Sequence, residues 1–367
     1  MKQYFSDIIK ILATEKPNRI ADACAKLNSD TYRNYPQFLY KYRYFDKENN
    51  HIDSLEKDYL WSIYPKDYCD PVDAAVNLKL KAELKSIESW VYSHAGEIFY
   101  YNIPPKGMMQ QKHGQTLAKY IEAQKHFVNE DGKIDFNAVR RSMLTEINKL
   151  PQKQRQEALK GFKYLETPEF EKTVEEHIKK TLYGIVNTFR ENTLIACLTA
   201  RKDNQKMWED YSNNYTGFVI EYKRPYYESL TDEQKSLLVT LLPVAYYKRI
   251  PGVELLPFIR YTFQKDLYGK EIDISDATVK LFRQILCKRS EYSSEEEWRI
   301  INNTKENTIP FPYISAVYAG YKISDDNMAQ LLEKCKKKNL PLYRQTFSGL
   351  SGKMTFEPVL EDALCVK

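Results

Sequence analysis

The sequence has little glycine and little cysteine, with 12 glycines and 6 cysteines in 367 residues. No two cysteines have CxxC spacing and the chain is not cysteine-dense, so we expect reduced thiols, as in a cytoplasmic protein. It has no GxGxxG or GxxxxGK[ST] loop, which excludes the common dinucleotide and nucleotide-phosphate cradles. It has no HExxH motif, and none of its 5 histidines lies at ligand spacing from a cysteine or an acid. We therefore expect no metal site.

Long apolar runs are also absent. No run approaches the roughly 20 residues that span a bilayer, and the richest stretch, 237–247, is interrupted by Thr240 and Pro243. The N-terminus reaches Asp7 and Lys10 too early for a signal peptide. The 55 basic and 50 acidic residues are too balanced to indicate nucleic-acid binding by themselves. These features predict a cytoplasmic protein that does not associate with a membrane.

Tyrosine is abundant instead, with 29 residues. Such an excess is typical of amphipathic surfaces, such as a cleft lined by rings with polar tips, although compositional bias explains it equally well. The chain is 43% hydrophobic and 29% charged, the balance of a folded protein with a substantial core.

Hydrophobic periodicity predicts strands at both ends of the chain and helices in its middle. We expect an α+β protein, with a mixed, largely antiparallel sheet formed by N- and C-terminal segments and a large helical insertion. The predicted parts are a helical appendage over 1–38, one domain over 39–347 with the insertion at 77–190, and a tail over 348–367. The strands are expected at 39–45, 59–63, 194–199, 217–222, 244–248, 297–302, 313–319 and 342–347. Helices are expected at 51–58, 205–213, 254–288 and 325–338.

Three adjacent acids precede a Trp-Arg-Ile-Ile strand signal near the C-terminal end. Alternation along a strand would place Glu295, Glu297 and Arg299 on one face and the residues between them on the other. Such a face either lies half exposed or lines a polar cleft. Glu297 is therefore a candidate general base or acceptor for a sugar hydroxyl. The alternative is a salt bridge with Arg299 or Lys288 on an exposed strand.

Three further patterns suggest binding or catalysis. Lys41 and Arg43 share a strand face and are suited to phosphate, or else they form a solvated face. Trp208 and Tyr211 lie three apart on a predicted helix and form either a platform for a ligand ring or part of the core. A carboxylate-plus-lysine layout suggests a metal-dependent nuclease as an alternative function. That layout comprises Asp210, Glu221 and Lys223.

Several of these segments together resemble the bacterial family catalogued as domain of unknown function 2971. Residues 39–43, 60–62 and 70–73 resemble its start. Residues 197–199, 207–211 and 217–222 resemble its central block, and residues 288, 295, 297–299 and 314–320 its last block. Three positions depart from the family pattern: Cys69 replaces an Asn, residues 197–199 replace Ser-Phe-Ser, and Asp210 replaces a His.

The order of these motifs is similar to that of the ADP-ribosyltransferase fold. This similarity implies an NAD-consuming enzyme, in the class of bacterial toxins or phage-defence effectors, that modifies a protein or nucleic-acid acceptor. It implies Glu297 and Thr199 as catalytic residues. It implies NAD contacts from Arg43 or Tyr42, and further NAD contacts from Lys41, Trp208 and Tyr211. It implies no metal, and it does not define the oligomeric state. A third hypothesis is a non-catalytic binding or sensor module that uses 77–190 as its partner surface.

Overall fold

A computed structural model describes the parts of the chain that carry its sheet. These are residues 35–48, 50–70, 72–80, 82–83, 86, 141, 144–145, 147–164, 168–261, 273–302, 306–348 and 351–359. The chain divides into two compact units. The first comprises Met1–Asn77, Thr188–Pro251 and Thr278–Lys367, and the second comprises Leu78–Asn187 and Gly252–Ala277. The helices predicted before residue 35 lie outside the described residues.

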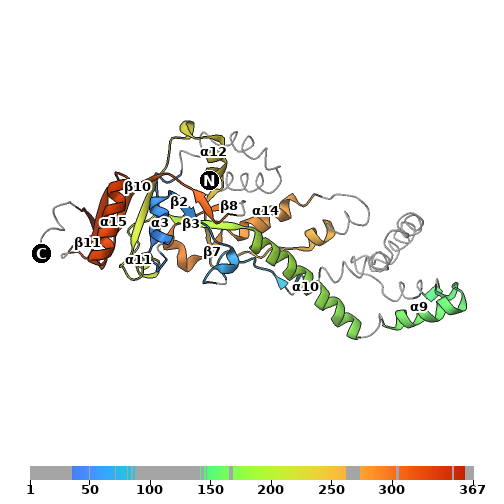
Figure 1. Ribbon diagram of the computed structural model, residues 1–367. Coiled ribbons are helices and arrows are strands. Elements are labelled where there is room, and N and C mark those ends of the chain that lie inside the picture. Colours follow the sequence, from blue (N-terminus) through green and yellow to red (C-terminus); the bar gives the residue numbers. More distant parts are fainter. Residues whose placement is uncertain are drawn as a thin grey trace. The chain divides into compact units, whose positions relative to one another are not determined.

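Among the described residues, one sheet of eight strands forms the first unit, in the order β12-β11-β10-β4-β1-β3-β8-β5 (Figure 1). Every neighbouring pair is antiparallel except β10 and β11. The predicted fold class, a mixed and largely antiparallel sheet drawn from both ends of the chain, is therefore confirmed. Its strands are β1 (Phe38–Arg43), β3 (Leu194–Thr199), β4 (Phe218–Lys223), β5 (Leu241–Pro243), β8 (Glu297–Asn302), β10 (Ile314–Ala319), β11 (Leu342–Phe347) and β12 (Met354–Pro358).

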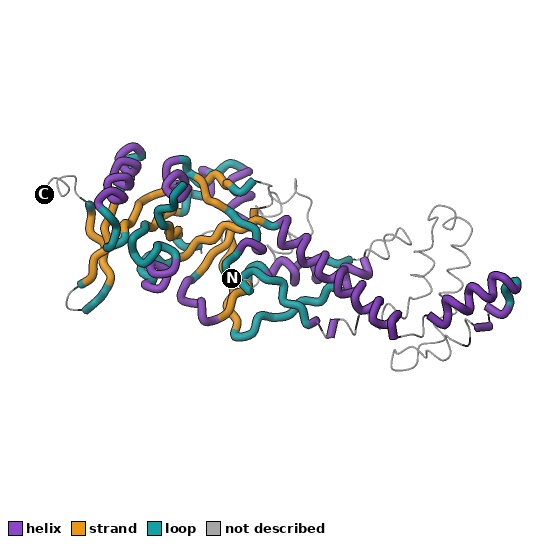
Figure 2. Tube along the Cα trace, turned by 60° about the horizontal axis from the view of Figure 1, so that its bottom comes forward, coloured by secondary structure: helices purple, strands orange, loops and turns teal. Residues whose placement is uncertain are grey.

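Two short strand pairs and a set of helices complete the description (Figure 2). β2 (Tyr59–Trp61) pairs with β9 (Thr308–Pro310), and β6 (Ala245–Tyr247) pairs with β7 (Cys287–Arg289). The helices are α3 (Asn50–Glu56), α9 (Gln152–Tyr164), α10 (Pro168–Asn192), α11 (Gln205–Asp210), α12 (Asp232–Val239), α14 (Ser275–Gln284) and α15 (Asp325–Lys337). Short 3₁₀ helices are η1 (Pro65–Asp67), η3 (Tyr227–Ser229) and η4 (Ser290–Glu295).

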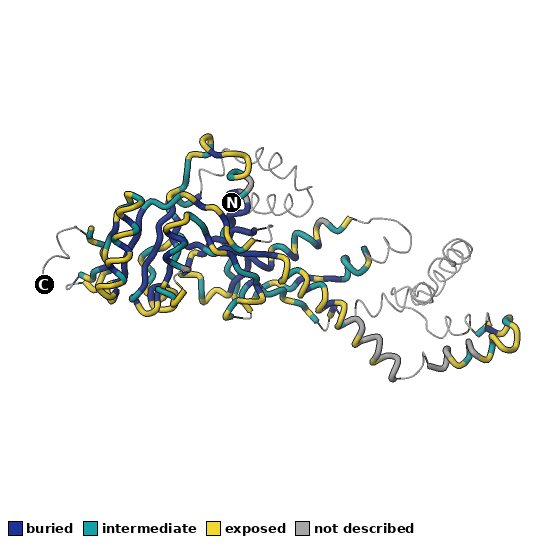
Figure 3. Tube along the Cα trace, in the orientation of Figure 1, coloured by how far each residue is buried: buried dark blue, intermediate teal, exposed yellow. Residues whose placement is uncertain are grey.

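The two faces of the sheet differ in chemistry. One face, called the apolar face below, carries Leu39, Leu198, Phe218 and Trp298. This face packs on side chains of α3, α12 and α15, and its strands are buried in Figure 3. The other face, called the mixed face, carries an aromatic cluster around Trp208 and an apolar cluster near the start of β3. Polar and charged side chains of β3 and β8 share this mixed face.

Two glycines allow close backbone approaches at the ends of β4 and β10. A Cβ at Gly217 would lie 2.0 Å from the Arg43 carbonyl oxygen, and one at Gly320 would lie 2.0 Å from that of Tyr215. No real Cβ tolerates such a distance, so only glycine fits at either position.

The structure departs from the sequence prediction at several boundaries. Part of the predicted tail forms β12, which pairs with β11 because its backbone groups complete the sheet edge. The strand predicted at 244–248 corresponds to β6, while β5 just before it was not predicted, and the predicted 254–288 helix ends before β7. The helix predicted at 205–213 ends at Asp210 because residues 213–215 have positive φ values. The helical insertion was predicted at 77–190, whereas the second compact unit comprises Leu78–Asn187 and also Gly252–Ala277.

Candidate functional site

Five charged side chains meet on the mixed face of the sheet and form what we call the charge cluster. Its members are Asp73, Lys288, Glu295, Glu297 and Arg299. Lys288 comes from β7, Glu295 from η4, and Glu297 and Arg299 from β8, while Asp73 comes from a turn far away in sequence. The cluster contains three carboxylates and two cations, so its net charge is −1 when all are ionised.

Lys288 is the centre of the cluster. Its Nζ lies 2.6 Å from Glu295 Oε2, 3.0 Å from Glu297 Oε2 and 3.2 Å from Asp73 Oδ2. All four side chains are buried or nearly so. One ammonium group therefore binds three carboxylates, which matches the three donors of a lysine.

Arg299 closes the cluster from the same strand as Glu297. Its Nε donates to Glu297 Oε1 at 2.8 Å, and its Nη2 donates to Asp73 Oδ1 at 2.6 Å and to Glu297 Oε2 at 3.2 Å. Its Nη1 donates to the Ile285 carbonyl oxygen at 2.5 Å. The guanidinium is 0% exposed. A buried arginine with this set of partners holds the surrounding elements in one geometry.

Backbone conformation explains how two acids two residues apart reach the same ammonium. Glu295 ends a 3₁₀ helix and Glu297 begins a strand, so regular alternation does not relate them. Glu296 between them adopts a left-handed conformation with φ of 44°. This turn brings both flanking carboxylates to Lys288. On the other side, the Asp70 side chain accepts a hydrogen bond from the Val72 backbone at 2.8 Å, forming an Asx turn just before Asp73.

The two glutamates differ in ionisation. Burial opposes the charge of Glu297, but Arg299 and Lys288 outweigh burial and lower its pKa. Burial raises the pKa of Glu295, and the charge of Lys288 opposes this only partly. Glu295 Oε1 has no hydrogen-bond partner among the described residues, whereas both oxygens of Glu297 accept bonds. The two neighbouring carboxylates are therefore shifted in opposite directions, with the pKa of Glu297 lowered and that of Glu295 raised.

Several tyrosines lie around the charge cluster, and the Tyr68 ring centroid lies 5.8 Å from the central carbon of the Arg299 guanidinium. The Tyr246 hydroxyl accepts a hydrogen bond from the Glu297 backbone at 2.8 Å, and the Tyr292 ring lies 4.9 Å from Lys288 Nζ. Tyr211 is 44% exposed. Burial raises the pKa of the Tyr211 hydroxyl. The charge of Lys288 opposes this shift, whereas the charges of Glu295 and Glu297 add to it. Tyr211 thus lies between the cluster and solvent.

Three of the predicted site residues come together here. Thr199 and Glu297 are cross-strand neighbours on β3 and β8, and the charges of Glu295 and Glu297 raise the pKa of the Tyr211 hydroxyl. The Thr199 hydroxyl donates to the Glu295 carbonyl oxygen and accepts from the Arg201 backbone at 3.0 Å. Thr199 therefore fixes the segment that carries Glu295.

Two predicted residues, Lys41 and Arg43, lie elsewhere. Tyr40 pairs with Thr199, so strand alternation places Lys41 and Arg43 on the apolar face, opposite the charge cluster. The Lys41 Nζ donates to the Cys197 carbonyl oxygen at 2.5 Å, at the level of the backbone. The expectation that Arg43 shares a site with Thr199 and Glu297 is therefore wrong.

Two other predicted NAD contacts, Trp208 and Tyr42, are core residues. Trp208 is 0% exposed, and its Nε1 donates to the Lys202 carbonyl oxygen at 2.8 Å. Tyr42 is buried against it, with ring centroids 5.3 Å apart, and donates to the Arg201 carbonyl oxygen at 3.0 Å. Neither ring has a free face, so Trp208 is a core residue and the platform interpretation is wrong for Trp208.

The strand of Glu297 is not half exposed as one interpretation required. All six residues of β8 are buried, because aromatic and apolar layers cover both faces. Alternation is nevertheless as predicted, with Glu297 and Arg299 on one face and Trp298 and Ile300 on the other. Glu297 makes salt bridges with Lys288 and Arg299, as the salt-bridge alternative expected, but these salt bridges are buried and not on an exposed strand.

The residues proposed for a nuclease have separate partners. Asp210 pairs with Lys206 at 2.9 Å on an exposed helix face. Glu221 is buried and accepts hydrogen bonds from Tyr318 at 2.7 Å and Ser315 at 2.8 Å. Lys223 is exposed at the end of β4. Within the described ranges, no group of three or more His, Cys, Asp or Glu residues is arranged to hold a metal ion.

Four members of the charge cluster were not predicted as site residues, namely Asp73, Lys288, Glu295 and Arg299. Lys288, Glu295 and Arg299 belong to the stretch around Trp298, where Lys288 and Arg299 were expected only as salt-bridge partners of Glu297. Asp73 follows the Asp-Pro turn. Nothing in the sequence links positions 73 and 288, since only the tertiary structure brings them within 3.2 Å. The acids at 295 and 297, which strand alternation places on one face, are the local signal for Glu295.

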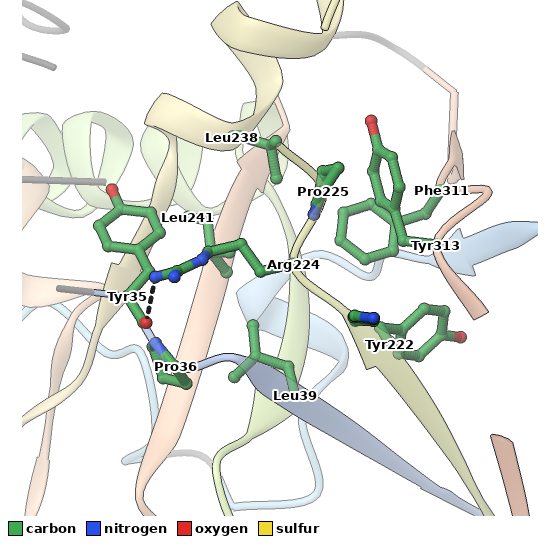
Figure 4. Close-up of a pocket in the computed structure, with 11 residues that line it drawn as sticks. Tyr35, Pro36, Leu39, Tyr222, Arg224, Pro225, Leu238, Leu241, Phe311 and Tyr313 are labelled. Carbon is green, nitrogen blue, oxygen red and sulfur yellow. Dashed lines mark hydrogen bonds between the residues drawn. The ribbon is translucent and has the colours of Figure 1, made fainter. Parts of the chain in front are cut away.

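A small apolar pocket lies on the apolar face, away from the charge cluster (Figure 4). Leu39, Tyr222, Leu241 and Phe311 contribute to its lining, and Arg224 donates to the Tyr35 carbonyl oxygen at 2.5 Å beside it. Since the sheet separates this pocket from Glu297, it is not part of the candidate site.

Lowering the pH is expected to decrease the free energy of unfolding through protonation of Glu297. The pKa of Glu297 falls from its ordinary 4.5 to about 2 in the folded protein, so the folded state binds fewer protons than the unfolded chain. Its contribution is complete above 4.5 and is lost as pH falls toward 2. We expect the free energy of unfolding to drop by about 2 kcal/mol through this group between about pH 5 and about pH 3. Denaturant titrations should show a shallower drop in Glu297→Gln, and parallel curves would contradict this assignment.

The comparisons with known proteins give a family and no activity. A family model described as Protein of unknown function (DUF2971) matches residues 207–300, which include Tyr211, Lys288, Glu295, Glu297 and Arg299. The resemblance to this family is therefore confirmed over that segment. No curated protein and no solved structure matches the chain. Within the described residues, no helix is both long enough and apolar enough to span a bilayer.

Proposed function

We propose that the protein is an ADP-ribosyltransferase-like enzyme that cleaves the glycosidic bond of NAD at the charge cluster. The observation that carries the proposal is the pair Glu295 and Glu297 on one ammonium group, beside Thr199 and Tyr211. Pairs of carboxylates whose environments push their ionisation apart recur at sites that cleave glycosidic bonds. The four free cysteines of the described residues suit a reducing cytoplasm.

The roles of the two acids follow from their contacts. Glu297, ionised and fixed by Lys288 and Arg299, supplies negative charge that favours an oxocarbenium-like centre as nicotinamide leaves. Glu295, with a raised pKa and an oxygen that no described residue binds, accepts the proton of the incoming hydroxyl. The exposed ring of Tyr211 provides a stacking surface. The acceptor is a protein or nucleic acid, as for a bacterial toxin or phage-defence effector.

Nicotinamide release from NAD by the purified protein tests this function. We expect Glu295→Gln and Glu297→Gln each to lower turnover by about 10²-fold or more, because a general base or a charge stabiliser contributes that much. Glu291→Gln is the matched control, since Glu291 is exposed on the same 3₁₀ helix and, among the described residues, forms its salt bridge with Arg289 at 3.5 Å. It should leave turnover within about twofold. Thermal unfolding of each variant shows whether lost turnover reflects lost folding.

Two results would reject the proposal. One is the absence of NAD binding at millimolar concentration by calorimetry. The other is turnover that persists in both Glu295→Gln and Glu297→Gln, since then neither carboxylate takes part in the reaction.

A specific observation favours a second candidate, a non-catalytic binding or sensor module. Both oxygens of Glu297 already accept bonds from Lys288 and Arg299, as expected of a purely structural ion cluster. In that case Glu297→Gln changes stability or partner binding and no NAD turnover exists to lose. The nuclease alternative has no comparable support, since Asp210 and Glu221 have separate partners.

A further inference from the structure

β1 carries two cations, Lys41 and Arg43, on the apolar face of the sheet. Lys41 pairs with Ile220 and Arg43 with Phe218 on β4, and both β4 residues belong to the core cluster of that face. The two cations are two positions apart on one strand, so their side chains point to the same side. They lie on the opposite side from Glu297, whose face is fixed by the Thr199 pairing.

Arg43 is buried, and its charge has no carboxylate partner among the described residues. It is 8% exposed, and its Nε is shielded from solvent without a hydrogen-bond acceptor. Across the described residues, no hydrogen bond from its guanidinium and no ion pair is found for Arg43. The buried cations of the charge cluster, by contrast, each contact at least two carboxylates. An unpaired buried charge is costly, so its retention calls for a compensating anion.

Lys41 adds to this positive charge. Its Nζ donates to the neutral Cys197 carbonyl oxygen, and no carboxylate lies within ion-pair distance of it in the described part of the chain. Burial and the positive charge of Arg43 lower the pKa of Lys41 to about 8. The charges of Cys197 and Glu297 oppose this shift. Repulsion between these two positive charges on one strand face thus adds to the free-energy cost of burying them.

The groups whose charges raise the pKa of Arg43 are three tyrosine hydroxyls and one carboxylate. Burial lowers its pKa, opposed by Tyr222, Tyr59, Asp46 and Tyr44 in that order. Asp46, the acid in this set, accepts a hydrogen bond from the His51 backbone at 2.9 Å. Tyrosine hydroxyls can donate to an oxyanion, as can a guanidinium.

We propose that Arg43, supported by Lys41, forms an oxyanion-binding site of the phosphate class on the apolar face, separate from the charge cluster. The planar guanidinium offers parallel N–H donors that match two oxygens of a phosphate group. The lysine supplies the second positive charge that a dianion requires. The same chemistry serves free phosphate and the terminal phosphate of a nucleotide, so the test includes both.

The test is thermal unfolding and calorimetry with inorganic phosphate, pyrophosphate or ADP, against sodium chloride at equal ionic strength. Wild-type protein is expected to unfold at a higher temperature with at least one of these anions. Arg43→Met should weaken that anion's binding by at least about tenfold, the value of one charge-assisted hydrogen bond. In chloride alone it should unfold at the same temperature as wild type or higher, because it removes an unpaired buried charge. Arg344→Met, on an exposed arginine of β11, is the control and should change neither result.

Two outcomes would contradict the proposed oxyanion-binding site. Wild-type protein with no anion response, or a response kept in Arg43→Met, overturns the proposal. If Arg43→Met unfolds too early to measure, Arg43→Lys keeps the charge but loses the fork and should still bind more weakly. NAD turnover should be unchanged in Arg43→Lys, since Arg43 lies on the other face from Glu297. Loss of phosphate binding and loss of NAD turnover are therefore separate results.

Discussion

Arg299→Met is expected to destabilise the protein by about 3–5 kcal/mol, the cost of removing one partner from a buried ion pair. Arg299 is fully buried and binds Glu297, Asp73 and the Ile285 carbonyl oxygen. Methionine fills part of the space but leaves three carboxylates around Lys288 alone. The net charge of the buried cluster changes from −1 to −2, and burial leaves little solvent to screen it. Denaturant unfolding by circular dichroism measures the loss.

Two further variants make this result specific to the cluster. Arg201→Met removes an arginine whose side chain is 44% exposed and pairs with Asp203 and Glu296. It should cost less than about 1 kcal/mol, as exposed ion pairs do. The double variant Glu297→Gln with Arg299→Met restores the net charge of −1 and should recover part of the loss. If the single and double variants are equally unstable, charge balance is not what Arg299 supplies.

Trp208→Ala should also cost about 3–5 kcal/mol, as for other large-to-small substitutions of buried aromatic residues. Trp208 is 0% exposed and lies among the rings of Tyr42, Tyr215 and Phe356. Its removal leaves a cavity on the mixed face and frees the Lys202 carbonyl oxygen from its bond. The temperature of unfolding and the denaturant midpoint should both fall.

Tyr211→Ala is the matched control for Trp208, because the two residues lie three positions apart and differ in exposure. Tyr211 is 44% exposed, so its truncation should cost less than about 1 kcal/mol. If the NAD proposal is right, Tyr211→Ala raises KM while Trp208→Ala changes stability and leaves KM unchanged at temperatures where it is folded. The reverse pattern would mean that Trp208 contacts the ligand.

Thr199 shows how the site depends on backbone contacts as well as charge. Its hydroxyl binds the Glu295 carbonyl oxygen and the Arg201 backbone, so it links β3 to the segment that positions both glutamates. Thr199 is therefore a positioning residue on the evidence of its contacts. Its proposed role follows from the placement of Glu295, and no described contact requires it to bind substrate directly.

The sequence alone determined what depends on local geometry. The alternation of Glu297 and Arg299 with Trp298 and Ile300 was predictable, because neighbouring side chains in a strand point to opposite faces. For the same reason, Lys41 and Arg43 were predictable as a pair on one face. Most strand positions and the fold class followed from periodicity, which also depends on neighbouring residues.

The tertiary structure decided everything that depends on which segments meet. The pairing of Tyr40 with Thr199 set Arg43 on the face opposite Glu297, and no local pattern contains that register. The end of α11 at Asp210 separated a buried Trp208 from an exposed Tyr211, although helical spacing had placed them together. Asp73 reached Lys288 across more than two hundred residues of chain. Burial then turned an apparently solvent-exposed set of charges into a closed cluster, because desolvation makes each buried charge require a partner.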